Sequence, residues 1–391
     1  MSQADKRGGR RRGGGEALPL GARRHPLVTA VGRRLARRCD VPGGATLVLG
    51  CSGGADSVAL LICCAALARR GHRMGADGPA LRPIAVHVNH NLRSGAAADE
   101  SFVRGVCTRL DVPYRIAQVH PGNEPGNTAA NARRLRYTAL LREARAAGAS
   151  HVATAHHAED QLETVLIALH RGAGLDGLSG MRWRTPLDSA RSEPVHLVRP
   201  LLDQSKASCV ALCHAADIEF REDPTNEDPR TLRGRLRREV VPVLESLWPD
   251  SARRVAATAD LLESANQAVK GVVADVFGPT SERTWPRDRL RTLPAHLIAA
   301  GLRRAALDHL GAPSDELGQE QLLRAAEAVA SSQRRPRTFH WPHGLAVTVD
   351  VSTVALRHRP DDDADGRPAG AVEVRTQSPQ AARSSDAVRS S

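Results

Sequence analysis

The segment Ser52-Gly53-Gly54-Ala55-Asp56-Ser57 has the residue types and spacing of a phosphate-binding loop. It follows a short apolar run at 46–50 and leads into a helical run that begins near Ser57. Glycines allow a tight turn in which successive N–H groups point into one concavity, and such a concavity at a helix N-terminus binds phosphate. The hydroxyls of Ser52 and Ser57 would add donors, and Asp56 could hold a metal ion beside a phosphate. The alternative is a glycine-rich turn capped by Ser57; a Walker A loop is excluded, because no Gly-Lys-Ser/Thr follows.

Two histidines and two carboxylates form a second candidate site. His156 and His157 directly follow an apolar run at 151–155, and adjacent residues cannot both face one way on regular structure, so we expect His156 to be functional and His157 to be structural. Asp160 and Glu163 are three residues apart on the next helical run and share a face. Two carboxylates on one face repel each other unless they meet a cation. The pair therefore predicts a cation site, with exposed surface acids as the alternative.

Arginines form two groups that could bind phosphates. Arg133 and Arg136 share a face at the start of a long helical run, and they could bind ATP or RNA unless they lie on a solvated face. A denser group lies further along the chain: Arg230, Arg233, Arg235, Arg237 and Arg238. Such a run favours contact with an RNA backbone.

Alternating strand and helix signals surround these residues. Strands are predicted at 46–50, 83–90, 114–120, 151–155 and 196–202, and helices at 57–70, 99–110, 128–147, 158–171 and 205–216. This alternation predicts an α/β fold with a doubly wound parallel sheet. Ligands bind at the carboxyl ends of the strands in such sheets, which is where the loop at 52–57 and the two histidines lie.

The pattern changes after Pro229. Helices are predicted at 233–247, 251–277, 290–310 and 314–330, followed by strands at 338–341 and 345–356 that the turn at 342–344 joins as a hairpin. We therefore expect a disordered basic tail at 1–24, an α/β domain at 25–229, a smaller, mostly helical domain ending in a β-hairpin at 230–359, and a disordered tail at 360–391.

Composition narrows the class of protein. The chain has 391 residues and a formal net charge of +12, which favours a polyanionic partner such as nucleic acid, although so many arginines could also reflect coding bias. Aromatic residues make up only 3%, which argues against a single-strand binder built on stacking platforms. The seven cysteines form no C-x-x-C and predict reduced thiols rather than a zinc or iron–sulfur site. No apolar run reaches the roughly 18 residues of a membrane span, and no signal peptide is visible, so we expect a cytoplasmic protein.

The hexapeptide at 52–57 resembles the pyrophosphate loop of the PP-loop ATP pyrophosphatase superfamily. Within this superfamily the chain is similar to the tRNA(Ile)-lysidine synthase family, and matching motifs are dense from Leu47 to Leu247. These further motifs are at residues 87–90, 132–137, 154–164, 171–175, 177–181, 199–202, 222–226 and 235–242. Three positions depart from the family pattern. Glu159 stands where the family usually has Asp, Ala129 where it usually has Glu, and Gly234 where it often has Asn.

The resemblance implies an ATP-dependent ligase that acts on the wobble cytidine of the isoleucine tRNA with a CAU anticodon. The cytosine C2 oxygen attacks the α-phosphate of ATP and releases pyrophosphate. The ε-amine of L-lysine then displaces AMP, which gives lysidine and switches codon reading from AUG to AUA. The partners implied are that tRNA and L-lysine, with Mg²⁺ beside ATP; no membrane partner is expected, and a homodimer is left open.

Roles follow for the residues singled out above. The loop Ser52, Gly53, Gly54, Ala55, Asp56 and Ser57 would bind ATP, and the catalytic residues would be Asp56, His156 and Asp160. Lysine and the adenylate would be held by Arg136, Asp160 and Glu163, the tRNA by Arg235, Arg237 and Arg238, and Mg²⁺ by Asp56 and Asp160. The main alternative is another PP-loop tRNA-modifying enzyme such as a thiolase. A small-molecule synthetase of the amidotransferase type and a non-enzymatic RNA-binding protein are more distant alternatives.

Overall fold

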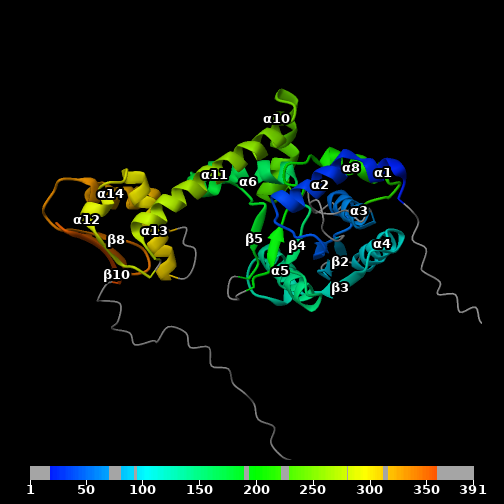
Figure 1. The fold of residues 1–391 in the computed structure, drawn as a ribbon, viewed down its shortest axis with the longest axis horizontal. Coiled ribbons are helices and arrows are strands. Elements are labelled where there is room, and N and C mark those ends of the chain that lie inside the picture. The colour runs from blue at the N-terminus through cyan, green and yellow to red at the C-terminus, as the bar shows by residue number, and fades with distance from the viewer. Residues whose placement is uncertain are drawn as a thin grey trace, which may run out of the picture. The chain divides into compact units, whose positions relative to one another are not determined.

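The chain divides into two compact units, Met1–Gln267 and Ala268–Ser391. The computed structural model describes residues 18–69, 81–91, 95–188, 193–221, 229–279, 281–310 and 316–358 (Figure 1). The division falls inside a long helix and differs from the predicted domain boundary at 229, which marks the change in the pattern of elements. Residues 230–267 belong to the first unit by their contacts.

A six-stranded sheet forms the centre of the first unit, in the order β3-β2-β1-β4-β6-β5. Its strands are β1 (Thr46–Gly50), β2 (Arg82–Asn89), β3 (Tyr114–Gln118), β4 (His151–Ala153), β5 (Arg184–Pro186) and β6 (His196–Val198). All neighbouring pairs are parallel except β5 with β6. The predicted α/β class and parallel sheet are confirmed, and β5 is an edge strand that the sequence did not predict.

Helices cover both faces of this sheet, as a doubly wound fold requires. They are α1 (Leu20–Arg24), α2 (Pro26–Arg37), α3 (Ala55–Arg69), α4 (Ala96–Arg109), α5 (Thr128–Ala146), α6 (Ala158–His170), α7 (Leu175–Leu178) and α8 (Lys206–Ala215), with a 3₁₀ turn η1 (Pro121–Asn123). Leu47 and Leu49 pack with α2, α3, α4 and α8, whereas Val48 packs with α5 on the other face. Side chains alternate along a strand, so each strand contributes to both cores.

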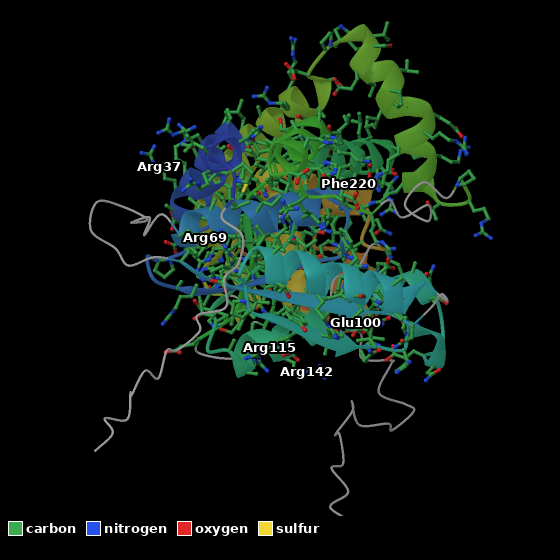
Figure 2. All side chains as sticks on the ribbon, turned by 90° about the vertical axis from the view of Figure 1, so that its right-hand side faces the viewer. Arg37, Arg69, Glu100, Arg115, Arg142 and Phe220 are labelled. Atoms are coloured by element: carbon green, nitrogen blue, oxygen red, sulfur yellow. The ribbon has the colours of Figure 1, made fainter. Side chains whose placement is uncertain are left out.

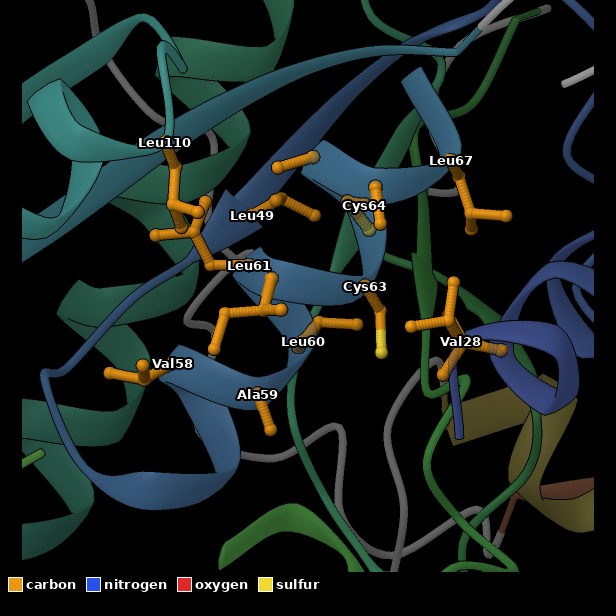
Figure 3. Close-up of a cluster of buried hydrophobic side chains, with 14 of the residues drawn as sticks. Val28, Leu49, Val58, Ala59, Leu60, Leu61, Cys63, Cys64, Leu67 and Leu110 are labelled. Carbon is orange, nitrogen blue, oxygen red and sulfur yellow. The ribbon is translucent and has the colours of Figure 1, made fainter. Parts of the chain in front are cut away.

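Helix α3 is apolar on all sides and lies in the larger of the two cores. Figure 3 shows its side chains between Val28 of α2, Leu49 of β1 and Leu110 after α4. Charged side chains lie on the outside of the unit, where Arg37, Arg115 and Arg142 are labelled in Figure 2. Because α3 is anchored on every side, the loop that precedes it is held firmly at the end of β1.

The prediction of a disordered tail through residue 24 is wrong for its last residues. Leu20–Arg24 form α1, and Ala22 is buried in the core. The segment is too short for a helical repeat to be visible in the sequence, and its order comes from packing. Residues 1–17 and the predicted tail at 360–391 lie outside the described residues.

A bent helical segment follows Pro229. It consists of α9 (Leu232–Arg235), a π-helical turn η3 (Leu236–Val240) and α10 (Val241–Leu247), and then α11 (Ser251–Phe277) begins. The sequence predicted one helix over this first stretch, at 233–247. The π turn adds a residue to one helical turn, which changes the direction of every side chain after it.

The second unit is helical with a four-stranded antiparallel sheet, β7-β10-β9-β8. Its further elements are β7 (Thr284–Pro286), α12 (Arg287–Leu290), α13 (Ala295–Leu310), α14 (Gln319–Ala330), β8 (Arg337–His340), β9 (Leu345–Val349) and β10 (Thr353–His358). The predicted hairpin is confirmed as β8 and β9, joined through a turn in which His343 and Gly344 have positive φ. The predicted second strand is split into β9 and β10, and β7 pairs with β10 to complete a sheet rather than a lone hairpin.

Within the residues described, no helix is both long and apolar enough to cross a membrane.

Candidate active site

The loop at 52–57 joins β1 to α3 and is closed by the hydroxyl of Ser57. Ser57 Oγ accepts hydrogen bonds from the backbone N–H groups of Ser52 (3.2 Å) and Gly53 (3.1 Å), and it donates to the carbonyl of Gly54 (2.9 Å). Gly53 has φ +91°, and a Cβ there would lie 3.3 Å from the ring of Phe102. The Ser57 hydroxyl therefore holds the loop in shape, and the first N–H groups of α3, which have no partner inside the helix, remain for a ligand.

Groups from three other segments of the chain support this loop. His87 Nδ1 lies 3.0 Å from the carbonyl oxygen of Cys51, the thiol of Cys213 lies 3.5 Å from the carbonyl oxygen of Ala55, and the Arg221 N–H donates to Gly53 (2.9 Å). These contacts come from β2, α8 and the segment after α8. The loop is thus fixed by elements far apart in the sequence.

His157 lies at the centre of three carboxylates. Its Nε2 is 3.5 Å from Asp56 Oδ2 and 3.6 Å from Asp160 Oδ2, and its Nδ1 is 2.8 Å from Glu159 Oε2. Burial favours the neutral ring, but Asp160, Asp56 and Glu159 together raise the pKa of His157 well above its ordinary 6.5. His157 is therefore an imidazolium that links the phosphate loop to α6.

His156 has a different environment from its neighbour. Its Nδ1 lies 2.9 Å from Thr154 Oγ1, and burial lowers its pKa to about 3, so the ring is neutral. The sequence assigned the functional role to His156 and a structural one to His157. The contacts place His157, not His156, against Asp56, and the spacing of His157 to Asp160 is that of a helix N-cap and its third residue, a signal that could have found it.

Asp160 and Glu163 are buried, and their cation is Arg237. The Arg237 Nε donates to Glu163 Oε1 (2.5 Å), and its NH2 group donates to Asp160 Oδ1 (2.6 Å) and Glu163 Oε2 (3.2 Å). The Glu163 side chain is 0% exposed and that of Asp160 12%, so the reading as exposed surface acids is excluded. One guanidinium thus spans the two carboxylates predicted to hold the lysine ammonium.

The pKa values of Asp160 and Glu163 are shifted in opposite directions. Burial raises the pKa of Glu163, although Arg237 acts against that rise. Burial also opposes ionisation of Asp160, but His157 and Arg237 outweigh it and hold the pKa of Asp160 below its ordinary range. Asp160 is ionised at neutral pH, and Arg237 keeps its charge because the two acids raise its pKa.

The other arginines of the predicted tRNA run lie outside. Arg235 and Arg238 are 62% and 51% exposed, and both contact Glu239 on the same helix. Arg237 turns inward to the acids, and Arg233 donates to Thr164 Oγ1 of α6 (3.4 Å). Arg136, predicted to bind lysine or the adenylate, lies on α5, with its guanidinium 3.3 Å from Nε2 of His90, which follows β2.

Gln161 makes a connection that the sequence did not reveal. Its side-chain amide accepts from the N–H of Met181 (2.7 Å) and donates to the Met181 carbonyl (3.1 Å). Gly180, with φ +63°, lies so close that a Cβ would meet the Gln161 amide at 2.7 Å. The segment Gly177–Met181 is therefore clamped to α6, and its glycine is required by close approach.

A PP-loop domain model matches residues 28–244 of this chain. The tRNA(Ile)-lysidine synthase of Bradyrhizobium diazoefficiens is 39% identical over 309 residues, which cover 75% of this chain and 81% of that protein. That of Salinispora arenicola is 40% identical over 343 residues, covering 82% and 94%, and that of Rhodopseudomonas palustris is 36% identical over 330 residues, covering 79% and 88%. The chain belongs to the tRNA(Ile)-lysidine synthase family.

The three departures from the family pattern have local contacts in this member of the lysidine synthase family. Glu159 accepts from the N–H of Lys206 with both carboxylate oxygens (3.1 Å each), so the longer acid caps α8 as well as contacting His157. Ala129 is exposed, and its N–H is capped by Asn127 (2.9 Å). Gly234 is buried, and its N–H donates to Thr231 Oγ1 (3.0 Å).

The donor set fits Mg²⁺ at Asp56 better than at Asp160. Asp56 Oδ1 is buried and has no hydrogen-bond partner among the described residues, whereas the Asp160 oxygens accept from Arg237 and from the N–H of His157. No group of three or more metal-ligating side chains occurs in the described part of the chain. Mg²⁺ commonly uses one or two carboxylates and completes its shell with phosphates and water, which this arrangement allows.

Proposed function

We propose that this chain ligates L-lysine to C2 of the wobble cytidine in the isoleucine tRNA with a CAU anticodon, using ATP, and so forms lysidine. Its family membership and its PP-loop domain support ATP-dependent tRNA modification. The observation that carries the proposal is the buried acid pair Asp160 and Glu163, joined through His157 to Asp56 of the phosphate loop. A site for a cationic amine thus lies beside a site for phosphate.

In the first step the cytosine C2 oxygen attacks the α-phosphate of ATP, and pyrophosphate leaves. The free N–H groups at the start of α3 bind the phosphates, and the Ser57 hydroxyl keeps the loop closed around them. Bound Mg²⁺ supplies positive charge to the phosphate oxygens. Asp56 would hold that ion through Oδ1, and the His157 imidazolium orients the Asp56 carboxylate through Oδ2.

In the second step the lysine ε-ammonium gives a proton to the Glu163 carboxylate, the free amine forms the C2–N bond, the C2–O bond to AMP breaks, and AMP leaves with the electron pair. Asp160 and Glu163 bind the lysine ammonium by sharing with it the oxygens that Arg237 now occupies. His156 is neutral, so its role is to orient substrate by hydrogen bonds rather than to store a proton. Arg136 on α5 and His90 after β2, whose side chains lie 3.3 Å apart, would contact the adenylate.

The thiolase alternative is disfavoured by the cysteines. All seven are described and buried, and burial raises the pKa of each thiol that faces the loop. Sulfur transfer needs accessible thiolates. The Cys51 and Cys213 thiols contact Ser57 and Ala55 instead, where they pack the loop.

Mass analysis of nucleosides tests the proposal directly. Isoleucine tRNA with a CAU anticodon is incubated with the protein, ATP and lysine, digested, and searched for lysidine. Omission of lysine should leave pyrophosphate release and the adenylate but no lysidine. A sulfur-containing base, or no tRNA product at all, would contradict the proposal.

The acid pair provides a second test. Glu163→Gln should raise the lysine concentration needed for half-maximal yield by about ten- to a hundredfold, as expected for loss of a charge-assisted contact. Glu239→Gln is the matched control, because Glu239 is an exposed acid on the Arg237 helix. If Glu163→Gln abolishes adenylate formation and leaves the lysine dependence unchanged, the acid belongs to the ATP site.

A further inference from the structure

The helical segment at 232–250 exposes large apolar side chains next to its arginines. Val243 is 52% exposed, Leu247 61% and Trp248 57%. Val241 and Leu244 of the same helix pack inward against α6 and α11, so the exposed residues occupy the opposite side. Val243, Leu247 and Trp248 belong to none of the hydrophobic clusters formed by the described residues of the first unit.

Trp248 differs from the other three tryptophans of the chain, all of which are described. Trp285 and Trp341 are buried at 1% and 3% exposure, and the Trp183 indole donates to Asp260 Oδ1 (3.1 Å). Trp248 ends α10, and its backbone is fixed by hydrogen bonds from its N–H to Leu244 and from Ser251 to its carbonyl. Its ring is therefore exposed on a hydrogen-bonded stretch of backbone.

We call the exposed side chains of residues 235–248 the ridge. Arg235 and Arg238 are exposed around the start of the π turn η3, and both contact Glu239. Val243, Leu247 and Trp248 are exposed on α10 and directly after it. Two cations therefore precede an exposed indole on one short stretch of chain.

We propose that this ridge binds tRNA, with Trp248 stacking on an unpaired base while Arg235 and Arg238 contact the adjacent phosphates; the inference rests on the proposed function. Charge complementarity favours RNA as the partner that binds this ridge. Residues 230–254 hold seven arginines and three acids, and the whole chain carries +12, so a second copy on this face would place like charges together. Only 3% of residues are aromatic, so one stacking position, not an extended platform, is what the chain can offer.

The test measures binding of the CAU isoleucine tRNA to the full chain and to Trp248→Ala, Trp248→Phe and Leu20→Ala. Leu20 is the matched control because it is an apolar side chain 53% exposed on α1. Trp248→Ala should weaken binding by about 5- to 150-fold, which corresponds to one stacked base at about 1–3 kcal/mol. Trp248→Phe should keep most of the affinity, and Leu20→Ala all of it.

Salt dependence separates stacking from charge. Trp248→Ala should leave the slope of log affinity against log salt unchanged, whereas Arg235→Gln with Arg238→Gln should flatten it by about 0.7–0.9 for each lost phosphate contact. Wild-type binding by Trp248→Ala overturns the proposal, as does a dimer that this variant dissociates. Because lysidine formation by the wild-type chain is measured separately, failure of the ridge and failure of the proposed function give different results.

Discussion

Replacing Arg237 with Met should destabilise the first unit strongly. The change keeps a long apolar stem but removes the guanidinium that contacts Asp160 and Glu163. Removal of one partner from a buried ion pair costs about 3–5 kcal/mol, because the other charge stays buried without a partner. The Arg237 side chain is 30% exposed, so water screens part of the interaction and we expect a loss of about 2–3 kcal/mol.

Urea unfolding followed by circular dichroism measures this loss. Arg235→Met is the matched control, because Arg235 lies on the same helix with its side chain 62% exposed and pairs with exposed Glu239. That variant should lose less than about 0.5 kcal/mol, as is usual for surface pairs. In the Arg237→Met background, Glu163→Gln removes the unpaired charge and should recover at least about half of the loss.

The loss should also depend on pH with a defined sign. Burial raises the pKa of Glu163 above its ordinary 4.5, and removal of Arg237 removes the group that opposes the rise. Above pH 4.5 the folded variant then binds more protons than the unfolded chain, so its stability falls as pH rises through the folded pKa. The deficit relative to wild type should be larger at pH 7.5 than at pH 5. Equal losses for Arg237→Met and Arg235→Met at both pH values would refute the assignment of Arg237 to the acid pair.

Three further changes test other parts of the chain. Asp56→Asn should slow tRNA-dependent pyrophosphate release without lysine by at least about a hundredfold, because a charge next to the reacting phosphates is lost; a normal rate would remove Asp56 from the mechanism. In a thiol titration at pH 8, no cysteine should react in the folded protein, and all seven should react in denaturant. The reason is that all are buried and that burial raises the pKa of thiols such as Cys64 to about 12. Reaction of any thiol in the folded protein would contradict this packing. Arg287→Met should lower the stability of the second unit by several kcal/mol, because the buried Arg287 guanidinium donates to the carbonyls of Val329, Ala328, Ser331, Gln333 and Asp350. Thermal unfolding measures this loss, with Arg324→Met as the control because Arg324 is exposed.

The parallel sheet could be predicted because its signals are local. β1 begins and ends where the apolar run at 46–50 predicted it. The prediction was possible because the buried strand, the glycine loop and the apolar helix follow one another within about 20 residues. β5 and β7 were missed because each is short, ends in a proline and lacks the apolar run that marks the equally short β4 and β6. Their order comes from strands paired with them across the sheet, β6 for one and β10 for the other.

The candidate site was predicted in its parts but not in its connections. The residue types of the loop at 52–57 indicate phosphate binding, and those of the acids Asp160 and Glu163 indicate binding of a cation. His157 was assigned to structure because its N-cap spacing to Asp160 was not used, and that spacing alone does not say which of the two adjacent histidines faces Asp56. That choice depends on β4 lying beside β1, which brings the two strand ends together.

Arg237 shows the same limit more sharply. The run from Arg230 to Arg238 reads as one basic surface, yet Arg237 turns inward to acids 74 and 77 residues away while Arg235 and Arg238 face solvent. The π-helical turn at Leu236–Val240 displaces the arginines from ordinary helical spacing, so periodicity could not separate them. The consequence for experiment is direct: weaker tRNA binding by Arg237→Met would not identify Arg237 as a phosphate contact, because that change also disturbs the helix that carries the exposed ridge. Trp248→Ala alters the outer side alone, so it separates RNA contact on the ridge from support of the acid pair beneath it.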